Sequence, residues 1–179
     1  MRTQSVLHLL EGAEITPKKR REAEAQIWEL RKKINYDTRE YCVEDLLDMF
    51  KDKTLRISGR KKSSWSWEKS SRFIENELLL RMPTISMAFR RKKDHFLIID
   101  GKKKALTLKK FVADGFPLTS LKWIPSMNHF YFSDFSAGMK REFQECPLRV
   151  IVIDDDTPEG IFEESANSDM HQPDSIGTR

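Results

Sequence analysis

The chain has 179 residues, of which 39% are hydrophobic, so it is long enough for one ordinary domain with a core and too short for two. Its two cysteines and four histidines lack the spacing of a disulfide framework or a zinc site, which indicates a reducing compartment and no structural metal. No apolar run approaches the roughly 20 residues of a membrane span, and the N-terminus lacks a signal-peptide pattern. We therefore expect a cytoplasmic protein without a membrane partner.

Charge is segregated along the chain although the formal net charge is only +4. Residues 154–179 contain eight acidic residues and one basic residue, whereas residues 51–110 contain 18 basic and 6 acidic residues. A surface with such an excess of positive charge attracts phosphates at moderate salt concentration. Nucleic acid or a nucleotide is therefore an expected partner, and a solvated charged surface is the alternative.

The first third of the chain predicts two helices and a short strand. Thr16 followed by Pro17 is a typical helix start, because threonine caps the first turn and proline fits the first helical position. The apolar face of that helix would contain Ala23, Ile27, Leu30 and Ile34. Residues 35–38 interrupt the pattern, residues 41–50 predict a shorter helix, and residues 54–58 predict a brief strand.

The middle of the chain predicts a helix, a β-hairpin and a second helix. A basic, serine-rich loop leads into a helix with Phe73 and Ile74 on its core face, which ends before Pro83. Apolar runs at 84–89 and 95–100 flank a charged segment, which is typical of a β-hairpin with a charged tip. The following helix has an apolar stripe and Gly115 at its end.

The last third predicts one strand with a clear apolar pattern. Residues 147–153 form a continuous apolar run that is typical of a buried strand. Before it, residues 129–135 predict a strand or an extended edge, and residues 136–145 predict a short helix. Helices and short strands are interspersed without a regular βαβ alternation, so the pattern favours the α+β class. Residues 166–179 are polar without a core-forming pattern, and we expect them to be disordered or to become ordered on a partner.

One segment, "HFLIIDGKKKALTLKKF" at residues 95–111, is suited to binding oxyanions. Gly101 lets the backbone approach a ligand closely, the first N–H groups of a helix lack helical partners, and the lysines supply positive charge. Asp100 can accept a hydrogen bond from a sugar hydroxyl or hold a divalent ion. Asp-Gly is also a common turn dipeptide, so a plain basic turn is the alternative.

Four segments occur in an order that resembles a known family. They are "QIWELRKKINYDTREYCVEDLLDMF", "WSWEKSSRFIENELLLRMPTISM", "FLIIDGKKKALTLKKF" and "LRVIVIDDDTPEGIFEES". Together they resemble the N-terminal domain of GmrSD-type modification-dependent restriction proteins over about residues 24–165. The resemblance implies a ParB/sulfiredoxin-like α+β domain at residues 51–165, preceded by an N-terminal helical extension at residues 1–50.

The resemblance also implies a nucleotide-binding site with an altered motif. In that family a Tyr-Gln-Arg segment precedes a tryptophan, the turn reads Asp-Gly-Gln-Gln-Arg, and the two together are associated with NTP hydrolysis and DNA nicking. Trp65 matches that tryptophan, and Asp100 and Gly101 match the turn, with Asp100 as the catalytic candidate. The expected phosphate-binding residues are Lys61, Asp100, Gly101, Lys102, Lys103 and Lys104.

Lysines stand where the family has arginines. A guanidinium grips phosphate through two parallel hydrogen bonds, whereas an ammonium is a flexible point charge. Lysine also lacks the acceptor that the family glutamines provide. We therefore expect a degenerate site that attracts phosphate without ordered hydrolysis, with NTP and Mg²⁺ as the only cofactors to consider.

A nucleic-acid surface is expected beside this site. Trp67 would stack on bases in a basic groove, and the hairpin tip would contact the phosphate backbone. The alternatives are a tryptophan packed on the core and a solvated tip. The residues expected to contact nucleic acid are Arg60, Lys62, Trp67, Arg90, Arg91, Lys92 and Lys93.

Three functions follow from these patterns. The preferred interpretation is a stand-alone GmrSD-like protein of bacteria–phage conflict, in restriction or anti-phage defence, that binds nucleotide or nucleic acid through a degenerate site. The first alternative is an active NTPase or DNA nickase of a restriction system. The second is a phage-encoded interaction module that inhibits a defence complex. The expected partner is thus DNA or a defence-system protein, and self-association stays open.

Overall fold

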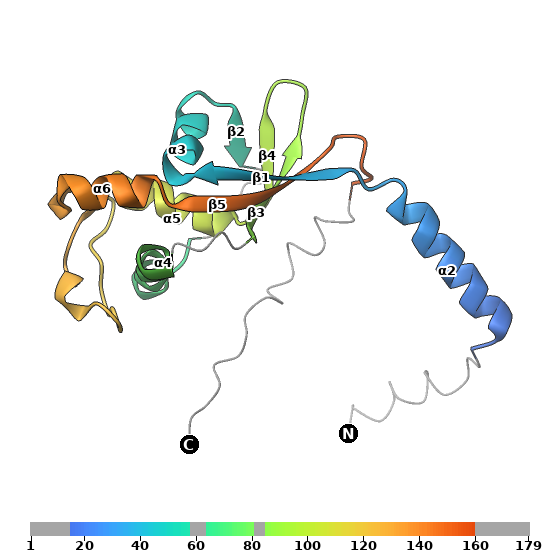
Figure 1. Ribbon diagram of the computed structural model, residues 1–179, viewed down its shortest axis with the longest axis horizontal. Coiled ribbons are helices and arrows are strands. Elements are labelled where there is room, and N and C mark those ends of the chain that lie inside the picture. The colour runs from blue at the N-terminus through green and yellow to red at the C-terminus, as the bar shows by residue number, and fades with distance from the viewer. Residues whose placement is uncertain (1–14, 58–63, 81–84, 160–179) are drawn as a thin grey trace, which may run out of the picture. The chain divides into compact units, whose positions relative to one another are not determined.

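The computed structural model describes residues 15–57, 64–80 and 85–159 (Figure 1). The chain divides into two compact units, Met1–Ile34 and Asn35–Arg179. The described part of the first unit consists mainly of α2 (Pro17–Arg31), in which the Thr16 side chain accepts a hydrogen bond from the Lys19 N–H. The predicted helix start is therefore confirmed. No residue of α2 is buried, so Trp28 and its apolar neighbours are exposed.

The described part of the second unit contains one mixed five-stranded sheet with the order β1-β5-β3-β4-β2 (Figure 1). The strands are β1 (Tyr36–Cys42), β2 (Leu55–Ile57), β3 (Ile85–Arg91), β4 (Phe96–Asp100) and β5 (Pro147–Ile153). The pairs β1–β5 and β3–β4 are antiparallel, and the pairs β3–β5 and β2–β4 are parallel. Helices and a mixed sheet in one unit confirm the α+β class.

The sheet is accompanied by α3 (Val43–Lys51), α4 (Trp67–Leu80), α5 (Lys102–Val112) and α6 (Ala137–Gln144). Strand β5 lies between β1 and β3 and buries Leu148, Val150 and Val152 completely, which confirms the predicted buried strand. A cluster of phenylalanines surrounds the end of α5. The rings of Phe116, Phe132, Phe135 and Phe143 lie 5.5 to 5.8 Å from that of Phe111.

Two predicted elements differ from the structure. The expected interruption at residues 35–38 includes the start of β1, a polar strand at the sheet edge whose side chains are largely exposed. The strand expected at residues 129–135 is wrong, because residues Phe132–Asp134 form a 3₁₀ turn. Phe132 and Phe135 there turn into the phenylalanine cluster, and the Asp134 carboxylate accepts a hydrogen bond from the Tyr131 N–H at 2.8 Å.

The first compact unit ends at Ile34, whereas the expected N-terminal extension continues to residue 50. Residues 35–50 were expected in the extension, whereas β1 pairs with β5 and α3 buries Val43 and Leu46 in the core of the second unit. The predicted hairpin and the strand at residues 55–57 are confirmed. The helix end expected before Pro83 and the segment 166–179 lie outside the described residues. No helix in the described parts of the chain is long and apolar enough to cross a bilayer.

Candidate nucleotide and nucleic-acid site

An open cleft of about 210 Å³ lies between the beginning of α4 and one face of α5. Its lining combines aromatic rings, hydroxyl groups and lysines, in particular Trp65, Ser66, Trp67, Lys103, Thr107 and Lys110. The four-residue spacing of Lys103 and Thr107 and the three-residue spacing of Thr107 and Lys110 place these side chains on the same face of α5. The cleft is therefore built by the two segments that the sequence singled out.

Trp67 is the first residue of α4 and stands at the cleft with 50% of its surface exposed. Its ring lies 5.2 Å from that of Phe116, which holds it against the phenylalanine cluster. The ammonium of Lys110 lies 4.3 Å from the centroid of the Trp67 ring, within the range of a cation–π interaction. Trp67 thus offers an exposed aromatic surface beside a positive charge.

Trp65 is more strongly packed than Trp67. It is half-buried, its ring meets that of Phe73 edge to face at 5.5 Å, and the Lys69 ammonium lies 5.3 Å from its centroid. Ser66 caps the helix by accepting a hydrogen bond from the Lys69 N–H at 3.3 Å. Both interpretations of the tryptophans therefore apply, packing for Trp65 and exposure for Trp67.

The turn at Asp100 and Gly101 has the expected backbone geometry. Gly101 adopts a φ of 81°, in the left-handed region that residues with a Cβ rarely adopt, and it precedes the first residue of α5. Its carbonyl accepts the hydrogen bond of the Ala105 N–H at 3.0 Å. Asp100 is exposed at the end of β4 and is not among the residues that line the cleft.

The structure brings only part of the expected phosphate-binding set to the cleft. Lys103 lines it, whereas Lys102 and Lys104 do not. Lys104 instead lies near Glu77 of α4. Burial raises the pKa of the half-buried Glu77 carboxyl, and the Cys146 thiol and the charge of Lys104 partly offset that effect. Lys61 and its neighbours Arg60 and Lys62 lie outside the described residues.

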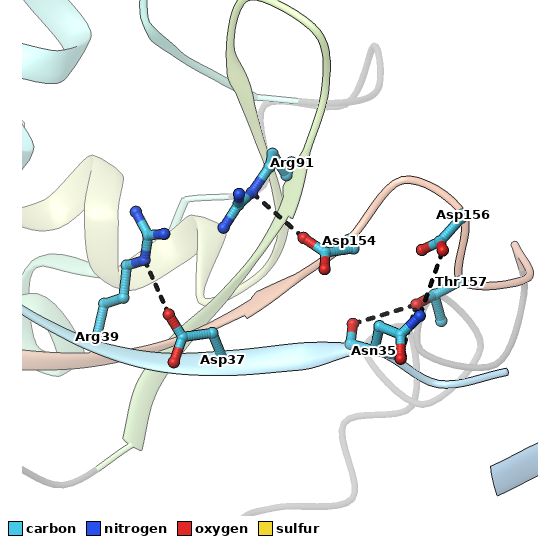
Figure 2. A network of polar contacts seen from close by, with 7 residues as sticks. All are labelled: Asn35, Asp37, Arg39, Arg91, Asp154, Asp156 and Thr157. Atoms are coloured by element: carbon cyan, nitrogen blue, oxygen red, sulfur yellow. Dashed lines mark hydrogen bonds and ion pairs between the residues drawn. The ribbon is translucent and has the colours of Figure 1, made fainter. Parts of the chain in front are cut away.

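The charged hairpin tip makes contacts within the protein. Arg90 is 1% exposed and donates a hydrogen bond from Nη1 to the Thr157 carbonyl at 2.7 Å, so its guanidinium is held inside. Arg91 Nε lies 3.3 Å from Asp154 Oδ1, and the Lys92 ammonium pairs with Asp155 (Figure 2 shows the Arg91 pair). Lys93 is exposed. The expected nucleic-acid contact by Arg90 is therefore replaced by a structural role.

The acidic turn after β5 is fastened to the start of β1 (Figure 2). The Asn35 N–H donates to Thr157 Oγ1 at 3.1 Å, and the Thr157 hydroxyl donates to the Asn35 carbonyl at 3.2 Å. The Asn35 side-chain amide donates to Asp156 at 3.2 Å. Within the described ranges, no three His, Cys, Asp or Glu side chains are grouped to hold a metal ion. The three consecutive aspartates after β5 instead contact Arg91, Lys92 and Asn35.

Sequence reasoning missed Glu75, a buried residue of α4 that binds the connection between α5 and α6. This carboxylate is 2% exposed and accepts hydrogen bonds from three consecutive backbone N–H groups, those of Lys122, Trp123 and Ile124, at 3.2, 2.6 and 3.0 Å. Burial by itself would raise the pKa of Glu75, but these donors and the charge of Arg72 outweigh it, so the pKa lies below its ordinary value.

Ser71, one turn earlier on α4, accepts a hydrogen bond from the Thr119 N–H at 3.0 Å. Trp67, Ser71 and Glu75 are four residues apart, so they follow one another along one side of α4. Each contacts a later part of the connection between α5 and α6, which Figure 1 shows as the yellow and light orange segment. The only signal in the sequence was the four-residue spacing of Trp67, Ser71 and Glu75.

Comparison with family models, curated proteins and solved structures gave no match to the chain. The fold and the site therefore define the class of molecule: an α+β domain with an open, basic cleft that exposes a tryptophan.

Proposed function

We propose that the chain binds a nucleotide or nucleic acid through the cleft between α4 and α5. The carrying observation is the Lys110 ammonium 4.3 Å from the centroid of the half-exposed Trp67 ring. Stacking of a base on an aromatic ring contributes about 1–3 kcal/mol. A lysine attracts the phosphate of the same nucleotide as a point charge. The cleft thus combines a base-stacking surface with a phosphate-attracting group.

The hydroxyl groups and the second lysine of the cleft support the same ligand class. Ser66 and Thr107 can donate to phosphate or sugar oxygens, and Lys103 adds positive charge at the first turn of α5. The first turn of a helix favours anions because the aligned backbone dipoles leave a partial positive charge there. Negative side chains are absent from the residues that line this described cleft, so nothing in its lining opposes an anionic ligand.

We further propose that the chain is a relative of the GmrSD-type restriction proteins, with a ParB/sulfiredoxin-like fold and a role in bacteria–phage conflict. The support is the resemblance of the four sequence segments, two of which form the walls of the cleft. The left-handed Gly101 between β4 and α5 fits the Asp-Gly turn of that family. The proposed partner is DNA or a protein of a defence system.

We propose binding without hydrolysis. Asp100, the catalytic candidate, is exposed and outside the lining of the cleft, and lysines occupy the positions of the family arginines. Lysine attracts phosphate but does not fix it in a plane, so the geometry for attack on the phosphorus is less ordered. NTP with Mg²⁺ is then a ligand and not a substrate.

Titration calorimetry with NTP and with DNA, each with and without Mg²⁺, tests this function when phosphate release is measured in parallel. We expect saturable binding that Trp67→Ala weakens by about tenfold, with no release of phosphate. The matched control is Lys51→Gln, which removes an exposed lysine at the end of α3. Equal affinity of Trp67→Ala and the wild type would overturn the site. Magnesium-dependent release abolished by Asp100→Ala would identify an active NTPase instead.

A further inference from the structure

A second tryptophan is exposed on the connection between α5 and α6. Trp123 has 65% of its surface exposed, the largest fraction among the described large hydrophobic side chains. The ammonium of Lys122 lies 4.7 Å from the centroid of the Trp123 ring. This pair repeats the chemistry of Trp67 and Lys110 in the cleft, a stacking surface beside a positive charge.

The backbone that carries Trp123 is fixed. The Trp123 N–H donates to the buried Glu75 carboxylate at 2.6 Å, and the Ile124 N–H donates to the same oxygen at 3.0 Å. The Leu121 N–H donates to the Asn128 side chain at 3.0 Å. Hydrogen bonds to an ionised group are stronger than neutral ones, so this stretch is held firmly. An aromatic ring on a fixed backbone binds with a smaller loss of conformational entropy than one on a mobile loop.

Trp67 begins α4, and the backbone of Trp123 is bound to Glu75 of the same helix. The connection contacts α4 through the rings of Phe116 and Trp67, then through Thr119 and Ser71, then through Trp123 and Glu75. Trp67 and Glu75 are eight residues apart, which corresponds to about 12 Å along a helix. Stacked bases in B-form geometry rise about 3.4 Å per nucleotide, so this length of helix corresponds to three or four stacked nucleotides.

We infer that Trp123 and Lys122 form a second base-stacking position, and that the ligand of this site is single-stranded nucleic acid of at least about four nucleotides. This inference rests on the proposed function of the cleft at Trp67. A mononucleotide reaches one tryptophan only, whereas a short strand reaches both. Single-stranded nucleic acid fits because its bases can leave their neighbours and stack on side chains, and lysines beside the rings attract the intervening phosphates.

The inference is tested by measuring the affinity of the full-length chain for three fluorescently labelled ligands. These are a mononucleotide, a six-nucleotide single strand, and a duplex of the same sequence. We expect the single strand to bind at least tenfold more tightly than the mononucleotide and more tightly than the duplex. Trp123→Ala should weaken the single strand about tenfold and leave the mononucleotide unchanged, because loss of one stacking contact costs about 1–3 kcal/mol. Trp123→Phe, which retains a ring, should recover most of the affinity.

The matched control is Trp28→Ala on α2, where Arg31 lies 5.8 Å from an exposed indole. It removes the same chemistry from the first unit and should leave the affinity for the single strand unchanged. Equal affinities of Trp123→Ala and the wild type for the six-nucleotide strand would overturn the inference and leave the cleft at Trp67 standing. A duplex that binds as tightly as the single strand would also overturn the inference. If Trp67→Ala affects none of the three ligands, the proposed function itself fails.

Discussion

The buried carboxylate of Glu75 accepts a 2.6 Å hydrogen bond from the backbone N–H of Trp123, 48 residues later in the chain. This bond joins α4 to the connection between α5 and α6, and with it the cleft at Trp67 to the exposed indole of Trp123. Because the carboxylate is ionised and accepts two further N–H groups, the contact depends on pH.

Stability should fall in acid because of Glu75. Its folded-state pKa lies below the ordinary value of 4.5, so its contribution to the free energy of unfolding is complete above that value and is lost as the pH falls through the folded pKa. Glu75→Gln should lose about 2 kcal/mol at pH 7 and show a weaker pH dependence below pH 4.5. Urea unfolding across this range measures both effects. Glu145→Gln, at an exposed position, is the control; an unchanged acid dependence in Glu75→Gln would contradict the assignment.

Glu77 should act in the opposite direction. Its pKa is raised by burial, so the folded state holds the proton more tightly than the unfolded chain, and stability falls as the pH rises from 4.5 through the folded pKa. Glu77→Gln should therefore leave stability at pH 7 equal to or above that of the wild type. Thermal unfolding at pH 5 and pH 7 measures the difference. A variant that is less stable than the wild type at pH 7 would show that the ionised form is favoured.

Arg90 should be needed for stability and not for ligand binding. Among the described residues it is the largest side chain that is less than 2% exposed, and its guanidinium donates to the Thr157 carbonyl. Arg90→Ala leaves a cavity and removes a charge-assisted hydrogen bond, so we expect a loss of about 2–4 kcal/mol. At a temperature where the variant is folded, its affinity for nucleic acid should match the wild type. A selective loss of affinity without loss of stability would return Arg90 to the binding surface.

Gly115 should be required for the position of Lys110. A Cβ at residue 115 would lie 2.7 Å from the Lys110 carbonyl oxygen and 2.5 Å from its Cγ. Gly115→Ala should therefore cost about 1–3 kcal/mol and weaken ligand binding, because Lys110 must move from the Trp67 ring. Gly138→Ala in α6 is the matched control, since its Cβ would meet nothing closer than 3.9 Å. There alanine should stabilise the helix by roughly 0.5–1 kcal/mol; similar effects of the two substitutions would contradict the steric argument.

The elements that were predicted correctly are those whose sequence pattern depends only on neighbouring residues. Thr16 and Pro17 begin α2 through a contact within one turn, and the apolar run at residues 147–153 buries itself as a strand in any α+β arrangement. Strand β1 was missed because its polar side chains face solvent at a sheet edge, so no apolar alternation marks it. The 3₁₀ turn at Phe132 was missed because it depends on the packing of Phe132 against Phe111, which is distant in the sequence.

The site was predicted in part for the same reason. Trp67 and Lys103 belong to segments whose local pattern already suggested a ligand, and they line one cleft. The roles of Arg90 and Glu75 depend on partners 67 and 47 to 49 residues away, which no local pattern specifies. The ion pairs of Arg91 and Lys92 could not be predicted, because their partners, the aspartates after β5, are distant in the chain.

The most direct test of the cleft is the salt dependence of single-strand binding to the wild type, to Lys110→Gln and to the control Lys51→Gln. Each phosphate contact contributes about 0.7 to the slope of log affinity against log salt concentration for single strands. We expect Lys110→Gln to reduce the slope by about 0.7 and to weaken binding, and Lys51→Gln to leave the slope unchanged. Saturable binding with identical slopes for the wild type and Lys110→Gln would contradict a nucleic-acid site between α4 and α5.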